Sequence, residues 1–256
     1  GSLQSFDSDG FTVGNDVGAN GNGQTFASWN WKANGQGSSN TEGSINTTYT
    51  SANTTSGFSI IQYTGNATAS ATIGHGLGKI PTMIIFRRYA QAENWDVYHQ
   101  AIGNAKSIRL NETGAAFDNA TALTSTTPTS NLITLGTSVT TNANGNPMIA
   151  YCFADVQGFS KMGSYIGNGN ADGTFAYTGF KPAFVMTRPS SGVGSWYMLD
   201  NKRANPFNVV TGRLEADGSG TENTGFTWCD FTSNGFKIRT TEGGINASGV
   251  TFIYMA

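Results

Sequence analysis

The chain has 256 residues, of which 34 are glycine, 12% are charged and 12% are aromatic, and its formal net charge is −2. This charge gives no electrostatic reason to expect binding to nucleic acid or to an anionic membrane. No apolar run approaches the roughly 20 residues that a membrane-spanning helix needs, so membrane insertion is not expected. The aromatic residues and recurring apolar runs argue against disorder, while abundant glycine, asparagine and threonine are typical of short strands joined by tight turns.

The first 32 residues are predicted to hold two strands joined by a turn. Residues 5–13 match residues 230–238 in sequence, and residues 23–31 match the segments that close the two repeats described below. Because these matches are to the end of a repeat, we expect residues 1–32 to be the C-terminal hairpin of a preceding module whose first part is missing. Gly1-Ser2 resembles a cloning scar, which suggests a fragment of a longer repetitive protein. An isolated hairpin is marginal in water, so this one is expected to pack on a sandwich or to complete a neighbouring chain's sheet.

Residues 33–56 are polar and low in sequence complexity. Glycine, serine, asparagine and threonine dominate the segment, a composition that favours a flexible connection over a packed element. We predict a linker here, with one weak strand at residues 44–49.

Two modules are predicted to follow, at residues 57–157 and 158–256, because the second repeats the first about 101 positions later (158 − 57). The recurring anchors are Gly57 and Gly158, Tyr63 and Tyr165, Pro81 and Pro182, Trp95 and Trp196, and, after a short insertion, Arg109-Leu110 and Arg213-Leu214. A period this long with this many anchors indicates a duplicated module.

The same series of short strands is expected in each module. In the first module they are residues 58–64, 82–88, 95–99, 107–111, 131–136 and 147–154, and in the second residues 180–188, 196–200, 235–240 and 250–255. Short strands separated by turn signals indicate an all-β chain of tandem antiparallel β-sandwiches, jelly-roll or lectin-like. One larger sandwich built from both copies is the alternative. The expected core comprises Phe11, Phe26, Trp29, Ile84, Phe86, Met148, Tyr151, Phe184, Met186, Phe236 and Phe252.

Signatures of catalysis are mostly absent from the sequence. Neither His75 nor His99 stands in a metal-ligand spacing, and no nucleophile elbow or phosphate-binding loop occurs. Paired carboxylates could cleave sugars, but the candidate acids are scattered and are expected to be solvated loop residues. They are Asp96, Glu112, Asp118, Asp200, Glu215 and Glu222. We therefore predict no catalytic residue, no cofactor and no enzyme activity, with a glycan depolymerase as the open alternative.

One short motif resembles a calcium-binding loop. In Asp7-Ser8-Asp9-Gly10, alternate aspartates could converge on a hard cation. The matching segment at residues 232–235 lacks both acids, so a plain turn before the next strand is the preferred interpretation. Asp7 and Asp9 remain weak candidates for calcium, and no other metal site is predicted.

Aromatic and arginine residues are the stronger candidates for binding. Trp95 and Trp196 occupy matching places, and a tryptophan ring packs well against the C–H face of a sugar while nearby polar groups bind its hydroxyls. A tryptophan that recurs in both modules also fits a core anchor, and Arg87 and Arg188 could instead form ion pairs at strand ends. The predicted glycan-binding residues are Trp95, Trp196, Tyr98, Arg87, Arg188 and Asp200.

Several motifs together resemble a known family. They are Phe6-Asp7-Ser8-Asp9-Gly10-Phe11-Thr12-Val13-Gly14, Phe26-Ala27-Ser28-Trp29-Asn30-Trp31, Gly74-His75-Gly76-Leu77-Gly78, Ala150-Tyr151-Cys152-Phe153-Ala154, Gly158-Phe159-Ser160-Lys161 and Tyr254-Met255-Ala256. Over essentially its whole length the chain resembles an uncharacterised repeat domain of tail or virion structural proteins of marine bacteriophages. The resemblance implies a virion component, such as a fibre, spike or decoration, and supplies no catalytic residues.

The sequence therefore predicts a virion module that attaches to a glycan on the host surface. Its expected partners are bacterial surface polysaccharide and other virion proteins, with a homo-oligomer as a further expectation. The alternatives are a polysaccharide-degrading tailspike domain and an architectural spacer. Exposed tryptophan rings over a groove would favour the binding module, and an acidic pair across a groove would favour the enzyme.

Overall fold

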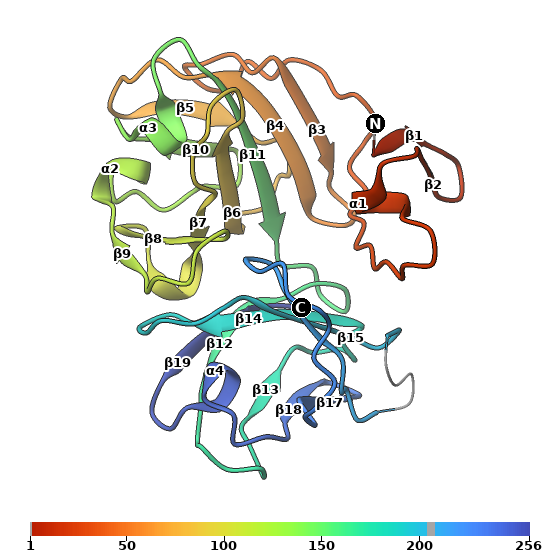
Figure 1. Ribbon diagram of the computed structural model, residues 1–256. Helices are drawn as coiled ribbons and strands as arrows, with labels where there is room; N and C mark the ends of the chain where they lie inside the picture. Colours follow the sequence, from red (N-terminus) through yellow and green to blue (C-terminus); the bar gives the residue numbers. More distant parts are fainter. Residues whose placement is uncertain (1, 204–207) are drawn as a thin grey trace. The chain divides into compact units, whose positions relative to one another are not determined.

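The computed structural model describes residues 2–203 and 208–256, and it is all-β with a few short helices (Figure 1). The strand pairs in this part of the chain are antiparallel. Two compact units are present, Gly1–Trp31 and Lys32–Ala256. No helix in the described ranges is long and apolar enough to cross a membrane.

The N-terminal unit contains the predicted hairpin. Strand β1 (Leu3–Phe6) pairs with β2 (Phe11–Val13), and helix α1 (Val17–Asn20) follows. The predicted burial of Phe11 and Phe26 is wrong, because their side chains are 38% and 52% exposed. So short a unit holds too little chain to enclose a core, which explains the exposure. Trp29 is half-buried.

Residues 32–157, the first half of the larger unit, form a sandwich of two sheets. The larger sheet has the order β3-β4-β11-β6-β7-β8-β9 and the smaller one pairs β10 with β5. The strands are β3 (Tyr49–Asn53), β4 (Phe58–Thr64), β5 (Ala71–Gly74), β6 (Pro81–Arg88), β7 (Asp96–His99), β8 (Lys106–Arg109), β9 (Phe117–Asp118), β10 (Leu132–Leu135) and β11 (Pro147–Ala154), and the helices are η1 (Gln100–Ile102), α2 (Ala120–Leu123) and α3 (Val139–Asn142).

Residues 158–256, the second half, also form two sheets. The larger sheet has the order β12-β19-β14-β15-β16, and the smaller one has the order β13-β18-β17. The elements are β12 (Met162–Ile166), β13 (Phe175–Tyr177), β14 (Phe184–Pro189), β15 (Tyr197–Asp200), β16 (Arg213–Glu215), β17 (Cys229–Thr232), β18 (Gly235–Ile238), α4 (Gly243–Asn246) and β19 (Thr251–Met255).

Strand order and register run in parallel in the two halves. The series β4-β11-β6-β7-β8 has the same connectivity as β12-β19-β14-β15-β16. Trp95 directly precedes β7, and Trp196 directly precedes β15. One predicted match is wrong: Asp96 faces Arg109 and Tyr197 faces Glu215, so Arg109 corresponds to Glu215 rather than to Arg213. The shared Arg-Leu sequence concealed this shift, because register is set by strand pairing and not by local identity.

Three apolar cores lie among the described residues of the Lys32–Ala256 unit. The first lies inside the first half and includes Ile84, Phe86 and Met148, as predicted. The second lies inside the second half and includes Phe236 and Phe252, also as predicted. The third contains side chains of both halves, among them the predicted Met186. These side chains come from the faces of the two larger sheets that point away from the first and second cores. Tyr151 and Phe184 are half-buried and pack against this third core.

The predicted linker at residues 33–56 is part of the folded unit. Its strand β3 pairs along β4, and Ile45 is buried in the first core. The hydroxyl of Ser51 donates to the carbonyl of Gly35 at 2.7 Å and accepts from the N–H of Asn34 at 2.9 Å. The linker prediction was wrong because an edge strand and side chain–backbone hydrogen bonds can order a segment that contributes few apolar groups.

A buried asparagine closes each sandwich in the same way. In the second half, Asn246 lies at the end of α4 and is fully buried. Its amide donates to the carbonyls of Thr240 at 2.7 Å and Asn170 at 2.8 Å, and its side-chain oxygen accepts from the N–H of Asn168 at 3.0 Å. One side chain thus satisfies three backbone groups of segments that are distant in sequence, which fixes the turn after β12.

Asn142 makes the same three bonds at the end of α3 in the first half. Its amide donates to the carbonyls of Gly136 at 2.7 Å and Thr68 at 3.1 Å, and its oxygen accepts from the N–H of Asn66 at 2.8 Å. In the N-terminal unit, Asn20 at the end of α1 is exposed and donates to the carbonyl of Gly14 at 2.9 Å.

We expect Asn246→Ala to lower the free energy of unfolding by about 2 kcal/mol, because it leaves buried backbone groups without a partner. Urea denaturation at neutral pH measures this loss. Asn20→Ala is the matched control and should change the stability by less than about 0.5 kcal/mol, because the site is exposed to water. Equal effects of the two substitutions would contradict the prediction.

Candidate ligand-binding pocket

Four of the six predicted glycan-binding residues are buried. Trp196 and Arg188 are completely covered, and Tyr98 is 5% exposed in the first core. The carboxylate of Asp200 is 8% exposed and forms an ion pair with the Arg203 Nε at 2.6 Å. Burial raises the pKa of Asp200, but hydrogen bonds from the Arg203 guanidinium and from two backbone N–H groups outweigh burial, so the pKa is lowered overall. None of these side chains presents a surface on which a sugar could rest.

Arg188 and Trp196 instead join the two halves. The Arg188 guanidinium donates to the carbonyls of Arg109 at 2.8 Å and Glu112 at 2.9 Å, and it also donates to that of Gly114. The indole N–H of Trp196 donates to the Arg109 carbonyl at 2.9 Å. The guanidinium carbon lies 5.3 Å from the centre of the Trp196 ring, within cation–π range. Both residues therefore bind backbone of the first half.

The remaining two predicted residues are partly accessible. Arg87 and Trp95 are half-buried, and the Arg87 guanidinium carbon lies 5.3 Å from the centre of the Trp95 ring. The Trp95 ring also stacks on Tyr151, with 6.2 Å between the ring centres. This cluster offers partly exposed aromatic faces on the larger sheet of the first half.

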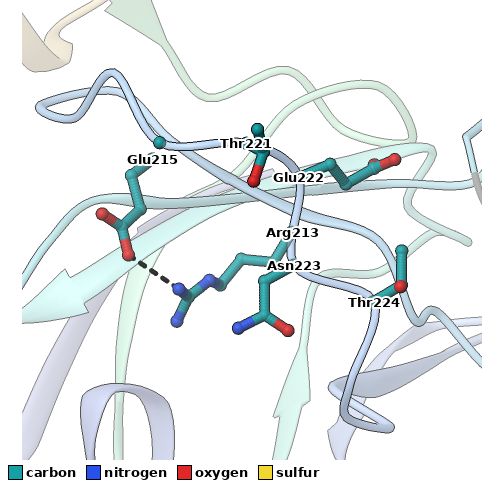
Figure 2. Close-up of a pocket in the computed structure, with 7 residues that line it drawn as sticks. Arg213, Glu215, Thr221, Glu222, Asn223 and Thr224 are labelled. Atoms are coloured by element: carbon teal, nitrogen blue, oxygen red, sulfur yellow. Dashed lines mark ion pairs between the residues drawn. The ribbon is translucent and has the colours of Figure 1, made fainter.

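A polar pocket of about 440 Å³ lies elsewhere, in the second half. Its walls come from β16 and from the loop that follows it, and Figure 2 shows Arg213 and Glu215 reaching toward one another beside that loop. The lining residues are Arg213, Glu215, Gly220, Thr221, Glu222, Asn223 and Thr224. The backbones of Arg213 and Asn223 hydrogen-bond to each other in both directions, at 3.0 and 2.9 Å, which holds the loop against the strand.

The Arg213 guanidinium is held rigidly in this pocket. Its carbon lies 4.0 Å from the centre of the Tyr197 ring and 4.7 Å from that of the Trp228 ring. Its terminal nitrogen pairs with Glu215 at 2.8 Å. Buried aromatic faces and a carboxylate restrict the rotamers of an arginine. Ligand binding would therefore cost little further side-chain entropy at Arg213.

The second carboxylate of the pocket, that of Glu222, is also paired with an arginine. Glu222 pairs with Arg203 at 2.6 Å, and Arg203 in turn pairs with Asp200. Each acidic side chain lining this pocket is therefore engaged by a guanidinium, Glu215 by Arg213 and Glu222 by Arg203.

No cation site is assembled in the described residues, since nowhere in them do three His, Cys, Asp or Glu side chains gather. The weak calcium candidate Asp7 accepts hydrogen bonds from the hydroxyls of Ser5 at 2.9 Å and Thr12 at 2.8 Å, which occupies its oxygens within the hairpin. Burial raises the pKa of Cys152 to about 12 and also raises that of Cys229, so neither thiol is poised as a nucleophile.

Sequence reasoning found this pocket only in part. Glu215 and Glu222 were among the scattered acids, and Arg213 was noted as a repeat anchor, but nothing indicated that they meet. Thr221, Asn223 and Thr224 lie in a polar loop whose only sequence signal is a run of small and polar residues. Such runs are common in surface loops, so the pocket emerges only when the loop is folded back on β16.

The chain belongs to the family described as a domain of unknown function, DUF7483, which matches residues 1–256. No curated protein and no solved structure matches the chain. The description of this family names no activity.

Proposed function

We propose that this chain is a non-enzymatic module of a bacteriophage virion that attaches to a glycan on the host surface. Its two halves are tandem copies of one β-sandwich module, as the common strand order and the matching asparagine bonds support. The observation that carries the binding assignment is the rigid polar pocket around Arg213. The marine phage origin rests on the sequence resemblance alone.

The chemistry of the pocket fits a sugar carrying hydroxyl and carboxylate groups. Arg213 supplies a fixed cationic donor, Glu215 supplies acceptors, and Thr221, Asn223 and Thr224 supply short neutral groups on the opposite wall. Hydrogen bonds to charged groups contribute about 1.5–3 kcal/mol each, which suits selective recognition of an acidic polysaccharide. Phe226, 46% exposed, lies two residues beyond the last lining residue and packs against Trp228, with 5.0 Å between the ring centres.

A weakly binding module becomes effective when it is displayed in several copies. Linked or clustered sites can bind a repetitive polysaccharide 10²–10⁴-fold more tightly than one site does. This is the reason to assign a shallow pocket to a virion component, where many copies meet one cell surface. A purely architectural spacer is the second candidate, favoured by the burial of Trp196 and Arg188 between the halves.

A glycan-array screen of the purified chain, followed by titration of the best ligand, tests the proposal. We expect binding to an acidic polysaccharide and a loss of about 10-fold or more in affinity in Arg213→Lys, because lysine keeps the charge but loses the fork geometry. The matched control is Arg88→Lys, which alters an arginine paired with Glu93 at 2.8 Å in the first half.

Each other outcome changes the assignment. Binding that is lost in Trp95→Ala but kept in Arg213→Lys would move the site to the aromatic cluster of the first half. Release of reducing ends or unsaturated sugars during incubation would identify a depolymerase. An array without any ligand would leave the spacer as the function.

A further inference from the structure

The third core joins the two halves through surfaces that are not alike. The second half contributes a set of side chains that we call the filled socket, namely Met162, Arg188, Trp196, Ile253 and Met255. The first half contributes what we call the buried plug, namely Val97, Ile108 and the carbonyl groups of residues 109–114. The contact is therefore heterologous, with a different surface on each side.

Strand register identifies the counterpart of the socket on the first half. Met162 faces Met255 as Ile60 faces Tyr151. Arg188 faces Ile253 as Arg87 faces Ile149. Trp95 precedes β7 as Trp196 precedes β15. We call this second set the open socket, and its members are Ile60, Arg87, Trp95, Ile149 and Tyr151.

The two sockets differ in burial at every position. In the filled socket, Arg188, Trp196 and Ile253 are 0% exposed, and Met162 and Met255 are 1% and 4% exposed. All five residues of the open socket are only half-buried. The arginine–tryptophan geometry is nevertheless preserved, with 5.3 Å from guanidinium carbon to ring centre in both. The open socket therefore resembles the filled one in its residues and in its arginine–tryptophan contact, but Ile60, Trp95 and Tyr151 pack against the third core without being enclosed by it.

The plug also has an exposed counterpart, on the second half. Met198 faces Leu214 as Val97 faces Ile108. Val97 and Ile108 are completely buried, whereas Met198 and Leu214 are half-buried. We call Met198, Leu214 and residues 215–220 the open plug.

We propose that copies of this chain associate head to tail, with the open plug of one copy seated in the open socket of the next. The contact repeats the one between the two halves. Arg87 and Trp95 of one copy donate hydrogen bonds to backbone carbonyls of residues 215–220 of the next, as Arg188 and Trp196 do to carbonyls of residues 109–114. A heterologous contact of this kind builds rings or filaments rather than closed pairs. Residues 215–220 include Glu215 and Gly220 of the Arg213 pocket, but the proposed contact requires no glycan in that pocket.

Sedimentation velocity of the full chain over a range of concentrations tests the proposal. We expect the average mass to rise with concentration beyond that of a dimer. Arg87→Glu should disrupt the open socket and Leu214→Asp should disrupt the open plug, each weakening association by about 10-fold or more. Circular dichroism and thermal melting verify that both variants fold. Tyr177→Asp, a 65% exposed aromatic on the other sheet of the second half, is the control that should associate normally.

Mixing the two variants gives the decisive result. Each retains one intact surface, so an equal mixture should form a dimer of one copy of each and grow no further. A mixture that stays monomeric would overturn the proposal. A wild-type chain that stays monomeric near 1 mM would also overturn it, because a contact with a Kd of about 1 mM, or about 4 kcal/mol, would already be half formed there. Association abolished by Phe6→Asp, which alters the exposed hairpin, would also overturn it.

Discussion

Replacing Trp196 with alanine should lower the free energy of unfolding by about 3–5 kcal/mol, the range found for large aromatic side chains removed from a core. The ring is completely buried in the third core, and its N–H satisfies the carbonyl of Arg109. The substitution leaves both a cavity and an unpaired backbone acceptor at the contact between the halves. Chemical denaturation monitored by fluorescence and circular dichroism measures the loss.

Trp95→Ala is the matched control for this experiment. The residue has the same position relative to its strand and the same neighbouring arginine, but its ring is half-buried. We expect a loss of only about 1 kcal/mol, because less apolar surface leaves water on folding. If Trp95→Ala destabilised the chain as much as Trp196→Ala, the assignment of Trp196 to a special role between the halves would be wrong.

Acidification should destabilise the protein through His99. This ring is completely buried; its Nδ1 accepts from the N–H of Ala101 at 3.2 Å and its Nε2 lies 3.1 Å from the carbonyl of Tyr254. These partners require the neutral tautomer with the proton on Nε2. Burial lowers the pKa of His99 to about 4 from its ordinary 6.5, against a smaller opposite effect of the Tyr254 hydrogen bond.

The sign of the pH dependence follows from proton uptake. Below pH 6.5 the unfolded chain binds a proton at this histidine, whereas the folded protein does not until about pH 4. His99 therefore contributes its full stability above pH 6.5, and up to about 3 kcal/mol is lost as the pH falls toward 4. Urea denaturation at pH 7 and pH 4.5 should show a smaller difference for His99→Gln than for the wild type. The same pH dependence in both proteins would refute the role of His99.

Much of the secondary structure could be predicted from local patterns. Apolar strands such as β6, β11 and β14 were placed close to their observed positions, because alternation and turn residues specify a pleated strand locally. The position of Trp95 and Trp196 before equivalent strands was also expected. The prediction of a linker at residues 33–56 is wrong, because β3 is ordered by pairing with β4 and not by its own apolar content.

The candidate site could be predicted far less well. Glu222 and Arg213 are separated in sequence by a loop, and only the fold brings them to the walls of one pocket. Asp200 was expected to face a ligand but is taken by Arg203. Ion pairs of this kind depend on where a loop returns to the sheet, which a single sequence does not encode in any local pattern.

By itself, the sequence determined the all-β class, the hairpin at the N-terminus and the recurrence of an arginine and a tryptophan in each half. Only the tertiary structure decided that Arg188 and Trp196 are buried between the halves while Arg87 and Trp95 stay half-exposed. The local sequences are alike, so the difference cannot come from propensity or pattern. It comes from what packs against each pair, since burial is a property of two surfaces in contact and not of the residues that form one of them.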